Sequence, residues 1–156
     1  MYLPSAQFGR LKLVELTAAQ VVKTIQVSLI NAILMVQSYS KVPPKTGSIV
    51  VFSSQAATFG GHQISAYAAA KGGLESFVKG AARELGPLKI RINALSPGII
   101  LTDTLVKHGI NAKQLSETVP VGRLGTTVDV ANAVNWLMSN ESEYISGSII
   151  PLTGGR

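Results

Sequence analysis

The sequence has 156 residues, of which 46% are hydrophobic and 14% charged, and it contains no cysteine. This length and composition predict one folded domain and exclude a disordered tail, a disulfide framework and a site built on thiolates. The formal net charge is +6, but the 14 Lys and Arg residues are scattered without a run of three, which favours a solvated basic surface over nucleic-acid binding.

The N-terminal part of the sequence has neither the pattern of a signal peptide nor that of a membrane anchor. Residues 1–9 lack a basic stretch followed by an apolar one. The longest strongly apolar stretch, residues 27–36, is interrupted by Ser28 and Asn31 and is too short to cross a bilayer. We therefore expect a soluble, cytoplasmic protein that does not bind membranes.

The first predicted element is a long helix over residues 17–38. Thr17 is a favourable N-cap, and apolar residues recur after it at helical spacing. A proline pair at 43–44 breaks this pattern. The β-branched run over residues 47–52 then predicts a buried parallel strand, with Ser54 just after its carboxyl end.

The second half of the chain continues the alternation of helices and strands. After a loop with two glycines we predict a helix over 65–85, a strand over 89–95, a lid-like loop with one or two short helices over 99–119, a helix over 128–138 and a strand over 148–152. Thr126 or Thr127 is the expected cap of the last helix.

This order predicts an α/β fold, in which helices join parallel strands into a doubly wound, Rossmann-type sheet. Ligands bind such sheets at the carboxyl ends of the strands. Ser54 and the Pro97–Gly98 pair each fall at one of these ends, so the sequence places a ligand site there.

Tyr67 and Lys71 lie four residues apart in the predicted helix over 65–85 and therefore share one face. An ammonium one turn from a phenol favours the phenolate, so the pair can pass a proton to or from an alcohol oxygen. Ser54, 13 residues before Tyr67, can hold a carbonyl oxygen beside it. On spacing alone, an exposed Tyr–Lys pair is the commoner explanation.

Several segments, taken in order, resemble the short-chain dehydrogenase/reductase family. The most specific combines Ser53-Ser54 with Ser65-Ala66-Tyr67-Ala68-Ala69-Ala70-Lys71-Gly72-Gly73. The others are residues 91–98, which end in Pro97-Gly98, Thr102 five positions after Pro97, residues 120–125 with Asp129-Val130-Ala131, and residues 144–155, which end in Gly154-Gly155. The resemblance covers nearly the whole chain from about Leu16 onward.

The resemblance implies hydride transfer between NADP or NAD and a carbonyl/alcohol pair. Ser54 would hold the substrate oxygen, Tyr67 would act as general acid or base, and Lys71 would assist Tyr67 and bind the nicotinamide ribose. The residues implied to contact the cofactor are Tyr67, Lys71, Pro97, Gly98, Ile100 and Thr102. No metal site is expected, because the sequence has no cysteine and only two histidines.

The sequence departs from the family pattern in two places. The family begins with a strand, a glycine-rich turn and a helix that receive the cofactor pyrophosphate, and no such glycine pattern precedes Ser54. We therefore expect three N-terminal strand–helix units, about 90 residues, to be missing, so that residues 1–156 form a single partial domain. Ser28 stands where the family has a relay asparagine, and whether Ser28 or Asn31 replaces it stays open.

Two functions follow from these observations. The first is an oxidoreductase that resembles 3-oxoacyl-carrier-protein reductases or sugar and polyol dehydrogenases, acts on a small carbonyl or alcohol and forms a homodimer or homotetramer. Arg83 then either docks an acidic acyl carrier protein or is a plain surface charge or subunit contact. The alternative is a catalytically inactive remnant that binds no cofactor alone and keeps the helices over 17–38 and 65–85 as an oligomerisation module.

Overall fold

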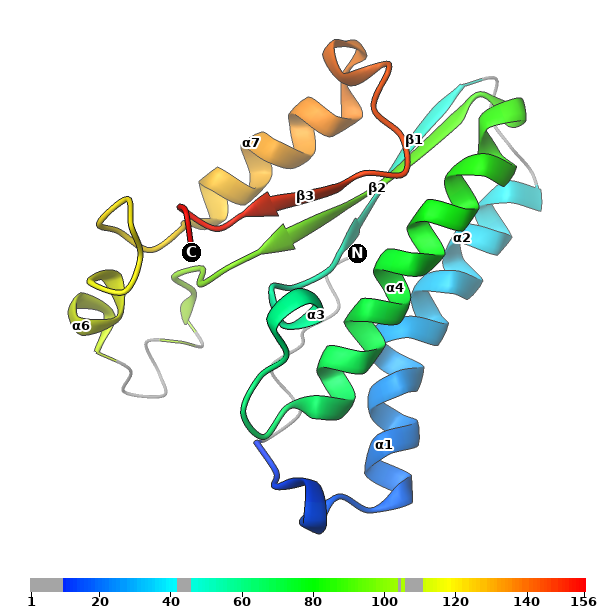
Figure 1. Ribbon diagram of the computed structural model, residues 1–156. Helices are drawn as coiled ribbons and strands as arrows, with labels where there is room; N and C mark the ends of the chain where they lie inside the picture. Colours follow the sequence, from blue (N-terminus) through cyan, green and yellow to red (C-terminus); the bar gives the residue numbers. More distant parts are fainter. Residues whose placement is uncertain (1–9, 42–45, 104, 106–110) are drawn as a thin grey trace.

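The computed structural model describes residues 10–41, 46–103, 105 and 111–156. Its strands are β1 (Gly47–Phe52), β2 (Ile90–Pro97) and β3 (Ile149–Leu152), which form one sheet in the order β1-β2-β3. Both strand pairs are parallel. Figure 1 shows helices on either side of this sheet, which confirms the predicted α/β class.

The helices follow the predicted order, with one addition. The first predicted helix consists of α1 (Ala18–Ile25), η3 (Gln26–Ile30) and α2 (Asn31–Lys41), and the later long helices are α4 (Ser65–Leu85) and α7 (Thr127–Met138). The shorter elements are η2 (Leu13–Glu15), α3 (Ala56–Phe59), η4 (Gly86–Leu88), α6 (Ala112–Ser116) and η5 (Asn140–Ser142). The sequence did not predict α3, and the proline pair and part of the lid lie outside the described residues.

The first helical run begins at the predicted cap. Thr17 Oγ1 accepts a hydrogen bond from the Gln20 amide at 3.3 Å, and the Gln20 side chain accepts one from the Thr17 amide at 2.9 Å. This reciprocal arrangement satisfies amide groups that have no partner inside a helix. The middle segment, η3, is a π-helical turn that contains the buried Ser28.

The helical run Ala18–Lys41 is longer than the apolar stretch over 27–36 from which the sequence excluded a membrane span. The run has 24 residues, and an 18-residue window of it has a mean hydropathy of 1.5, so its length and composition are enough to cross a membrane. Core helices of globular proteins pass the same test, and this run packs along α4. Length and hydropathy therefore give only weak support for a membrane span here.

Strand alternation divides the side chains of β1 between two helical layers. Ile49 and Val51 pack into the core formed with α4. Ser48, on the other face of the strand, donates from Oγ to the Leu137 carbonyl of α7 at 2.9 Å. Successive strand residues point to opposite faces, so α4 and α7 cover opposite faces of the sheet. The main core lies between α4 and β2 and contains Val78, Ala81, Leu85, Ile90, Ile92 and Ala94.

The parallel register brings the carboxyl ends of the three strands to one edge. Phe52 lies opposite Leu95, and the Ser53 amide donates to the Leu95 carbonyl at 2.8 Å. The Gly98 amide donates to the Leu152 carbonyl at 3.0 Å. The serines after β1, the Pro-Gly turn after β2 and the segment after β3 are thus neighbours, as the sequence predicted for a ligand site.

The second edge of β1 pairs with no strand within the described part of the chain. All six residues of β1 are half-buried, including the apolar Ile49, Val50 and Val51. An unpaired edge of this kind presents free backbone groups to which another strand can add.

Asn93 tests how strongly the sheet depends on one buried polar side chain. The residue is fully buried, its Nδ2 donates to the Ile145 carbonyl at 2.9 Å, and its Oδ1 accepts from the Ser148 amide at 3.0 Å. Asn93→Ala leaves the Ser148 amide without its partner and the Ile145 carbonyl with only the 3.2 Å bond from Arg91 Nη1, and it should lower the free energy of unfolding by about 1–3 kcal/mol. Chemical denaturation measures this loss. The exposed Asn132→Ala in α7 is the control and should change stability by less than about 0.5 kcal/mol.

Candidate active site

The Lys71 side chain reaches from α4 to the end of β1. Its Nζ donates a 2.6 Å hydrogen bond to the Phe52 carbonyl, in the last residue of the strand. Burial penalises the charged form and lowers the pKa of Lys71 from 10.5 to about 8. An ammonium has three donors, so this contact leaves two for other partners.

Tyr67 lies one turn before Lys71 on the same helix, as predicted. The Lys71 Nζ is 5.6 Å from the centre of the Tyr67 ring, within the range of a cation–π interaction. The structure therefore brings the phenol and the ammonium together at the start of α4. Neither residue is fully exposed, which contradicts the simple alternative of a solvated surface pair.

Ser54 follows the same strand end and lines an open hollow of about 490 Å³, whose lining does not include Tyr67 or Lys71. Its Oγ accepts a hydrogen bond from the Ala56 amide at 3.2 Å, at the beginning of α3. Pro97 and Gly98 also line this hollow. The complete lining is Ser54, Gln55, Ala56, Phe59, Gly60, Ile64, Pro97, Gly98, Ile99 and Arg156.

Gly98 is closely approached by two neighbours. A Cβ atom at this position would lie 2.9 Å from Gln55 Oε1 and 3.2 Å from Thr153 Cα. Gln55 in turn donates from Nε2 to the Arg156 carbonyl at 2.6 Å. A single amide side chain thus links the Pro-Gly turn after β2 to the segment that follows β3.

Ile100 and Thr102, also expected to contact the cofactor, belong to the segment that leaves the sheet after Gly98. Ile100 forms a parallel β-bridge with Gly125, and the Leu101 amide donates to the Gly125 carbonyl at 2.7 Å. Thr102 Oγ1 accepts from the Leu105 amide at 3.4 Å. The described contacts are those of Ile100 with Gly125 and of Thr102 with Leu105, and neither residue lines the hollow beside Ser54.

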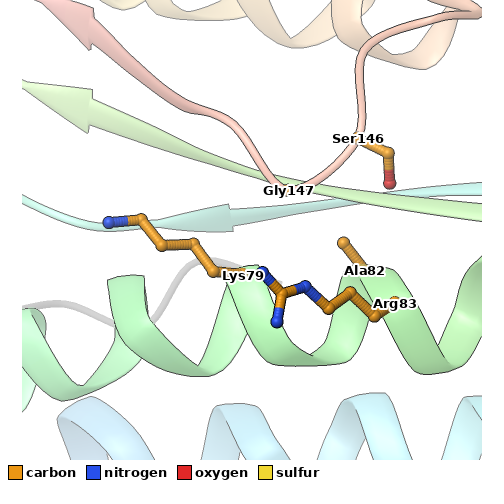
Figure 2. A pocket seen from close by; sticks show the side chains of 5 residues that line it. All are labelled: Lys79, Ala82, Arg83, Ser146 and Gly147. Carbon is orange, nitrogen blue, oxygen red and sulfur yellow. The ribbon is translucent and has the colours of Figure 1, made fainter.

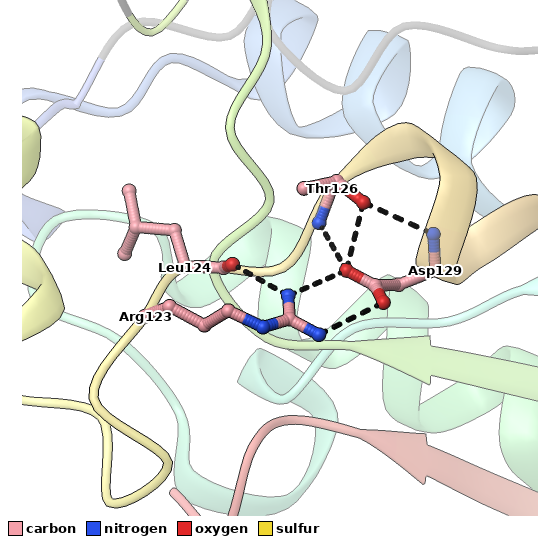
Figure 3. Close-up of polar contacts among 4 residues, drawn as sticks. All are labelled: Arg123, Leu124, Thr126 and Asp129. Carbon is pink, nitrogen blue, oxygen red and sulfur yellow. Dashed lines mark hydrogen bonds and ion pairs between the residues drawn. The ribbon is translucent and has the colours of Figure 1, made fainter.

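Arg123, Thr126 and Asp129 form a polar cluster around Gly125, the residue that pairs with Ile100 (Figure 3). Arg123 binds Asp129 with two hydrogen bonds, Nη1 to Oδ2 at 2.7 Å and Nη2 to Oδ1 at 3.0 Å. Asp129 also accepts from the Thr126 amide and hydroxyl, both at 2.8 Å, in the capping box of α7. The bonds from Arg123, and then those from Thr126, hold the pKa of Asp129 far below its usual range.

A second hollow, of about 370 Å³, lies away from the strand ends, between α4 and the chain that leads into β3. Figure 2 shows Lys79 and Arg83 emerging from α4 beside Gly147, with Ser146 across from them. Both basic residues are exposed, and neither forms an ion pair within the part of the chain that the structure describes. This face is therefore suited to an anionic partner.

The sequence prediction missed several residues of the site. Gln55 directly follows Ser54, and its position alone, after the strand end, is a usable signal for a residue that faces the ligand. Glu75 accepts a 2.6 Å hydrogen bond from the buried Ser53 and lies eight residues after Tyr67. That helical spacing places it on the same face as Tyr67 and Lys71, which was a second usable signal.

Comparison with known proteins links this geometry to a family. The family model described as enoyl-(acyl carrier protein) reductase matches residues 4–156. The human 3-oxoacyl-[acyl-carrier-protein] reductase is 32% identical over 145 residues, which make up 92% of this chain and 60% of the human protein. The chain spans about half the length of the curated relatives it matches, between 43% and 60% for three of them.

Solved structures share the fold. One is a short-chain dehydrogenase/reductase of the glucose/ribitol dehydrogenase type from Brucella melitensis, which superposes with a TM-score of 0.88 at 28% identity. The match covers 94% of this chain and 60% of the Brucella chain. A structure from Agrobacterium tumefaciens with bound NADP gives a TM-score of 0.87 at 29% identity, with 94% of this chain and 62% of its own covered.

The buried ammonium of Lys71 should make stability depend on pH. Because folding lowers its pKa, the unfolded chain binds more protons between about pH 8 and pH 10.5, and the cost of burying the charge disappears as pH rises through that window. The wild type should therefore gain about 3 kcal/mol relative to Lys71→Met between pH 7.5 and pH 11. Urea denaturation at a series of pH values measures this difference. Lys113→Met, at an exposed position, should show no such gain, and parallel curves for wild type and Lys71→Met would contradict the burial of this charge.

Proposed function

Because the chain belongs to the short-chain dehydrogenase/reductase family, we propose that it forms the catalytic part of an NAD(P)-dependent oxidoreductase that interconverts a carbonyl and an alcohol. The observation that carries this proposal is the placement of the Lys71 ammonium between the Tyr67 ring and the end of β1. Ser54 lies at that same strand end and opens onto a hollow large enough for a small substrate.

Each of the three residues has a distinct task in this reaction. The Ser54 hydroxyl donates a hydrogen bond to the substrate oxygen and holds it beside α4. Tyr67 gives its proton to that oxygen in reduction and takes it back in oxidation. Lys71 stabilises the phenolate that Tyr67 becomes after giving up its proton, and burial strengthens this interaction because water screens it less.

The residues at the strand ends fit a nicotinamide cofactor. Lys71 keeps two donors for ribose hydroxyls, and Pro97 and Gly98 line the hollow beside Ser54. The backbone of Pro97 and Gly98, with Ile100 and Thr102, would orient the ring. NADP or NAD supplies the hydride when bound, and the solved relative with NADP supports this cofactor class.

The pyrophosphate of that cofactor needs a glycine-rich turn at a helix N-terminus, and no such pattern precedes Ser54 in this sequence. We treat residues 1–156 as a single partial domain that carries the proton-transfer groups. On its own it should bind nicotinamide cofactors very weakly. The unpaired edge of β1 is where further strands of a complete sheet would add.

The lining of the hollow favours an apolar substrate over a polyol. Phe59, Ile64 and Ile99 contribute apolar side chains next to Ser54. This agrees with an acyl substrate, as in the human 3-oxoacyl-[acyl-carrier-protein] reductase. The exposed pair Lys79 and Arg83 would then bind an acidic carrier protein that brings the acyl group.

We further propose a cytoplasmic homodimer or homotetramer. The first helical run exposes large apolar side chains at Val22, Ile30, Leu34 and Met35, which are 36–65% exposed in the single chain. Large exposed apolar surfaces mark sites of protein–protein contact, and we infer that this run supplies the subunit interface. The inactive-remnant alternative uses the same surface, so activity and not assembly separates the two functions.

Tyr67→Phe removes the acid/base group and keeps the ring. The variant should lower turnover of a 3-oxoacyl substrate by about 10²–10⁴-fold, because proton transfer is lost, while the affinity for NADPH changes little. The assay follows NADPH absorbance in the 156-residue chain and in a chimera that adds the N-terminal units of the human reductase. Tyr144→Phe, at a fully exposed position, is the control and should retain full activity.

The chimera gives the decisive comparison for this proposal. Measurable reduction by the chimera that disappears with Tyr67→Phe supports the oxidoreductase function. A chimera that binds NADPH but reduces no carbonyl substrate, or a Tyr67→Phe variant with normal turnover, would leave the inactive remnant as the better description.

Arg83→Glu tests carrier docking on the same active enzyme. The charge reversal should raise the KM for an acyl-carrier-protein substrate by about tenfold, since a favourable charge pair becomes repulsive. The kcat, and the KM for the same acyl group on N-acetylcysteamine, should stay the same. Lys113→Glu serves as the control for net charge. An equal effect on both substrates would show that Arg83 does not recognise the carrier.

A further inference from the structure

Glu75 is an ionisable residue of α4 that the proposed reaction does not use. Its Oε1 accepts a 2.6 Å hydrogen bond from Ser53 Oγ, and Ser53 is only 5% exposed. Glu75 follows Lys71 by four residues and Tyr67 by eight, so the three side chains form one stripe along the helix. The stripe meets the end of β1, where Ser54 also lies.

Two successive turns of α4 hold two successive residues of this strand end. Lys71 donates to the carbonyl of Phe52, and Glu75 accepts from the hydroxyl of Ser53, both at 2.6 Å. Hydrogen bonds that involve an ionised group are shorter and stronger than neutral ones. The backbone of Ser53 is fixed on its other side by its amide bond to the Leu95 carbonyl at 2.8 Å.

We propose that Glu75 is a positioning residue of the proton-transfer site, which acts by holding Ser53 and so fixes the end of β1, with the Phe52 carbonyl and the adjoining Ser54, relative to α4. Without this bond, the strand end is free to move away from the helix. The Ser54 hydroxyl then loses its place relative to Tyr67, and the Lys71 ammonium loses part of its burial. The catalytic consequence rests on the proposed function, but the positional consequence is open to measurement without turnover.

The pKa of Lys71 shows whether the end of β1 keeps its position, because loss of the Glu75 charge and movement of the strand end shift this pKa in opposite directions. Loss of a negative charge one turn away lowers the pKa of a lysine, because the protonated form loses a favourable interaction. Movement of the strand end has the opposite effect, because water reaches the ammonium and raises its pKa from about 8 toward 10.5. The ionisable side chains of α1 and α2, namely Lys23, Tyr39 and Lys41, are all exposed.

The experiment is an NMR pH titration of the Lys71 side chain in the 156-residue chain, labelled with ¹³C-lysine and assigned with Lys71→Met. Glu75→Ala and Ser53→Ala should each raise the Lys71 pKa by about one unit or more. Glu75→Gln, whose amide oxygen still accepts from Ser53, should leave it unchanged or slightly lower. Glu84→Ala removes an exposed carboxylate from the same helix and should leave it unchanged.

A Lys71 pKa that stays the same or falls in both Glu75→Ala and Ser53→Ala would overturn the inference, as would Glu75→Gln behaving like Glu75→Ala. Circular dichroism establishes that each variant is folded, and Ser53→Ala decides the question if Glu75→Ala does not fold. In the active chimera, Glu75→Ala should lower kcat at least tenfold with an unchanged KM for NADPH, and Glu75→Gln should restore it. Unchanged kcat overturns the role, whereas an inactive wild-type chimera contradicts the proposed function and leaves the titration to decide the positioning.

Discussion

The hydrogen bond from Lys71 to the Phe52 carbonyl joins the two elements on which the site depends. Lys71 belongs to a 21-residue helix that packs mainly on β2, Phe52 ends the neighbouring strand β1, and the bond between them is 2.6 Å long. It exists because the core residues Val78, Ala81 and Leu85 press α4 onto the sheet and bring the start of the helix over the strand end. Packing of ordinary apolar residues therefore sets the place of a charged group that water would otherwise surround.

Burial of that ammonium has two opposite effects. It lowers the pKa of Lys71 to about 8, which makes the charged form less stable than in water. It also reduces the screening of the interaction between the ammonium and the Tyr67 ring, whose centre is 5.6 Å from Nζ. Burial of the ammonium is the cause of both effects: it lowers the stability of the fold, and it strengthens the interaction of Lys71 with the nearby phenol. Functional sites commonly show this combination.

Sequence periodicity predicted the elements that bury a continuous apolar face. Gly47–Phe52 and Ser65–Leu85 match the predicted strand and helix, and Thr126 is one of the two caps predicted for α7. The four-residue α3 was missed because a single helical turn buries too few residues to show a period. The pairing of Tyr67 with Lys71 follows from helical spacing, whereas Gln55 and Asn93 act through contacts with residues 101 and 52 positions away, which no local pattern encodes. The roles given to Ser54, Tyr67 and Lys71 remain predictions.

The site divides its chemistry between contacts made inside this chain and contacts that a whole sheet provides. Lys71, Ser53 and Glu75 find their partners in α4, at the end of β1 and, through the Ser53 amide, in β2, so their geometry needs only strands of this chain. Pyrophosphate binding needs a glycine-rich turn that this sequence does not offer before Ser54. The proton-transfer groups are therefore arranged by the packing of one helix on the sheet of this chain, while cofactor affinity depends on another part of the fold. That separation is why the pKa of one lysine in this chain reports on the arrangement of a site whose turnover requires more of the protein.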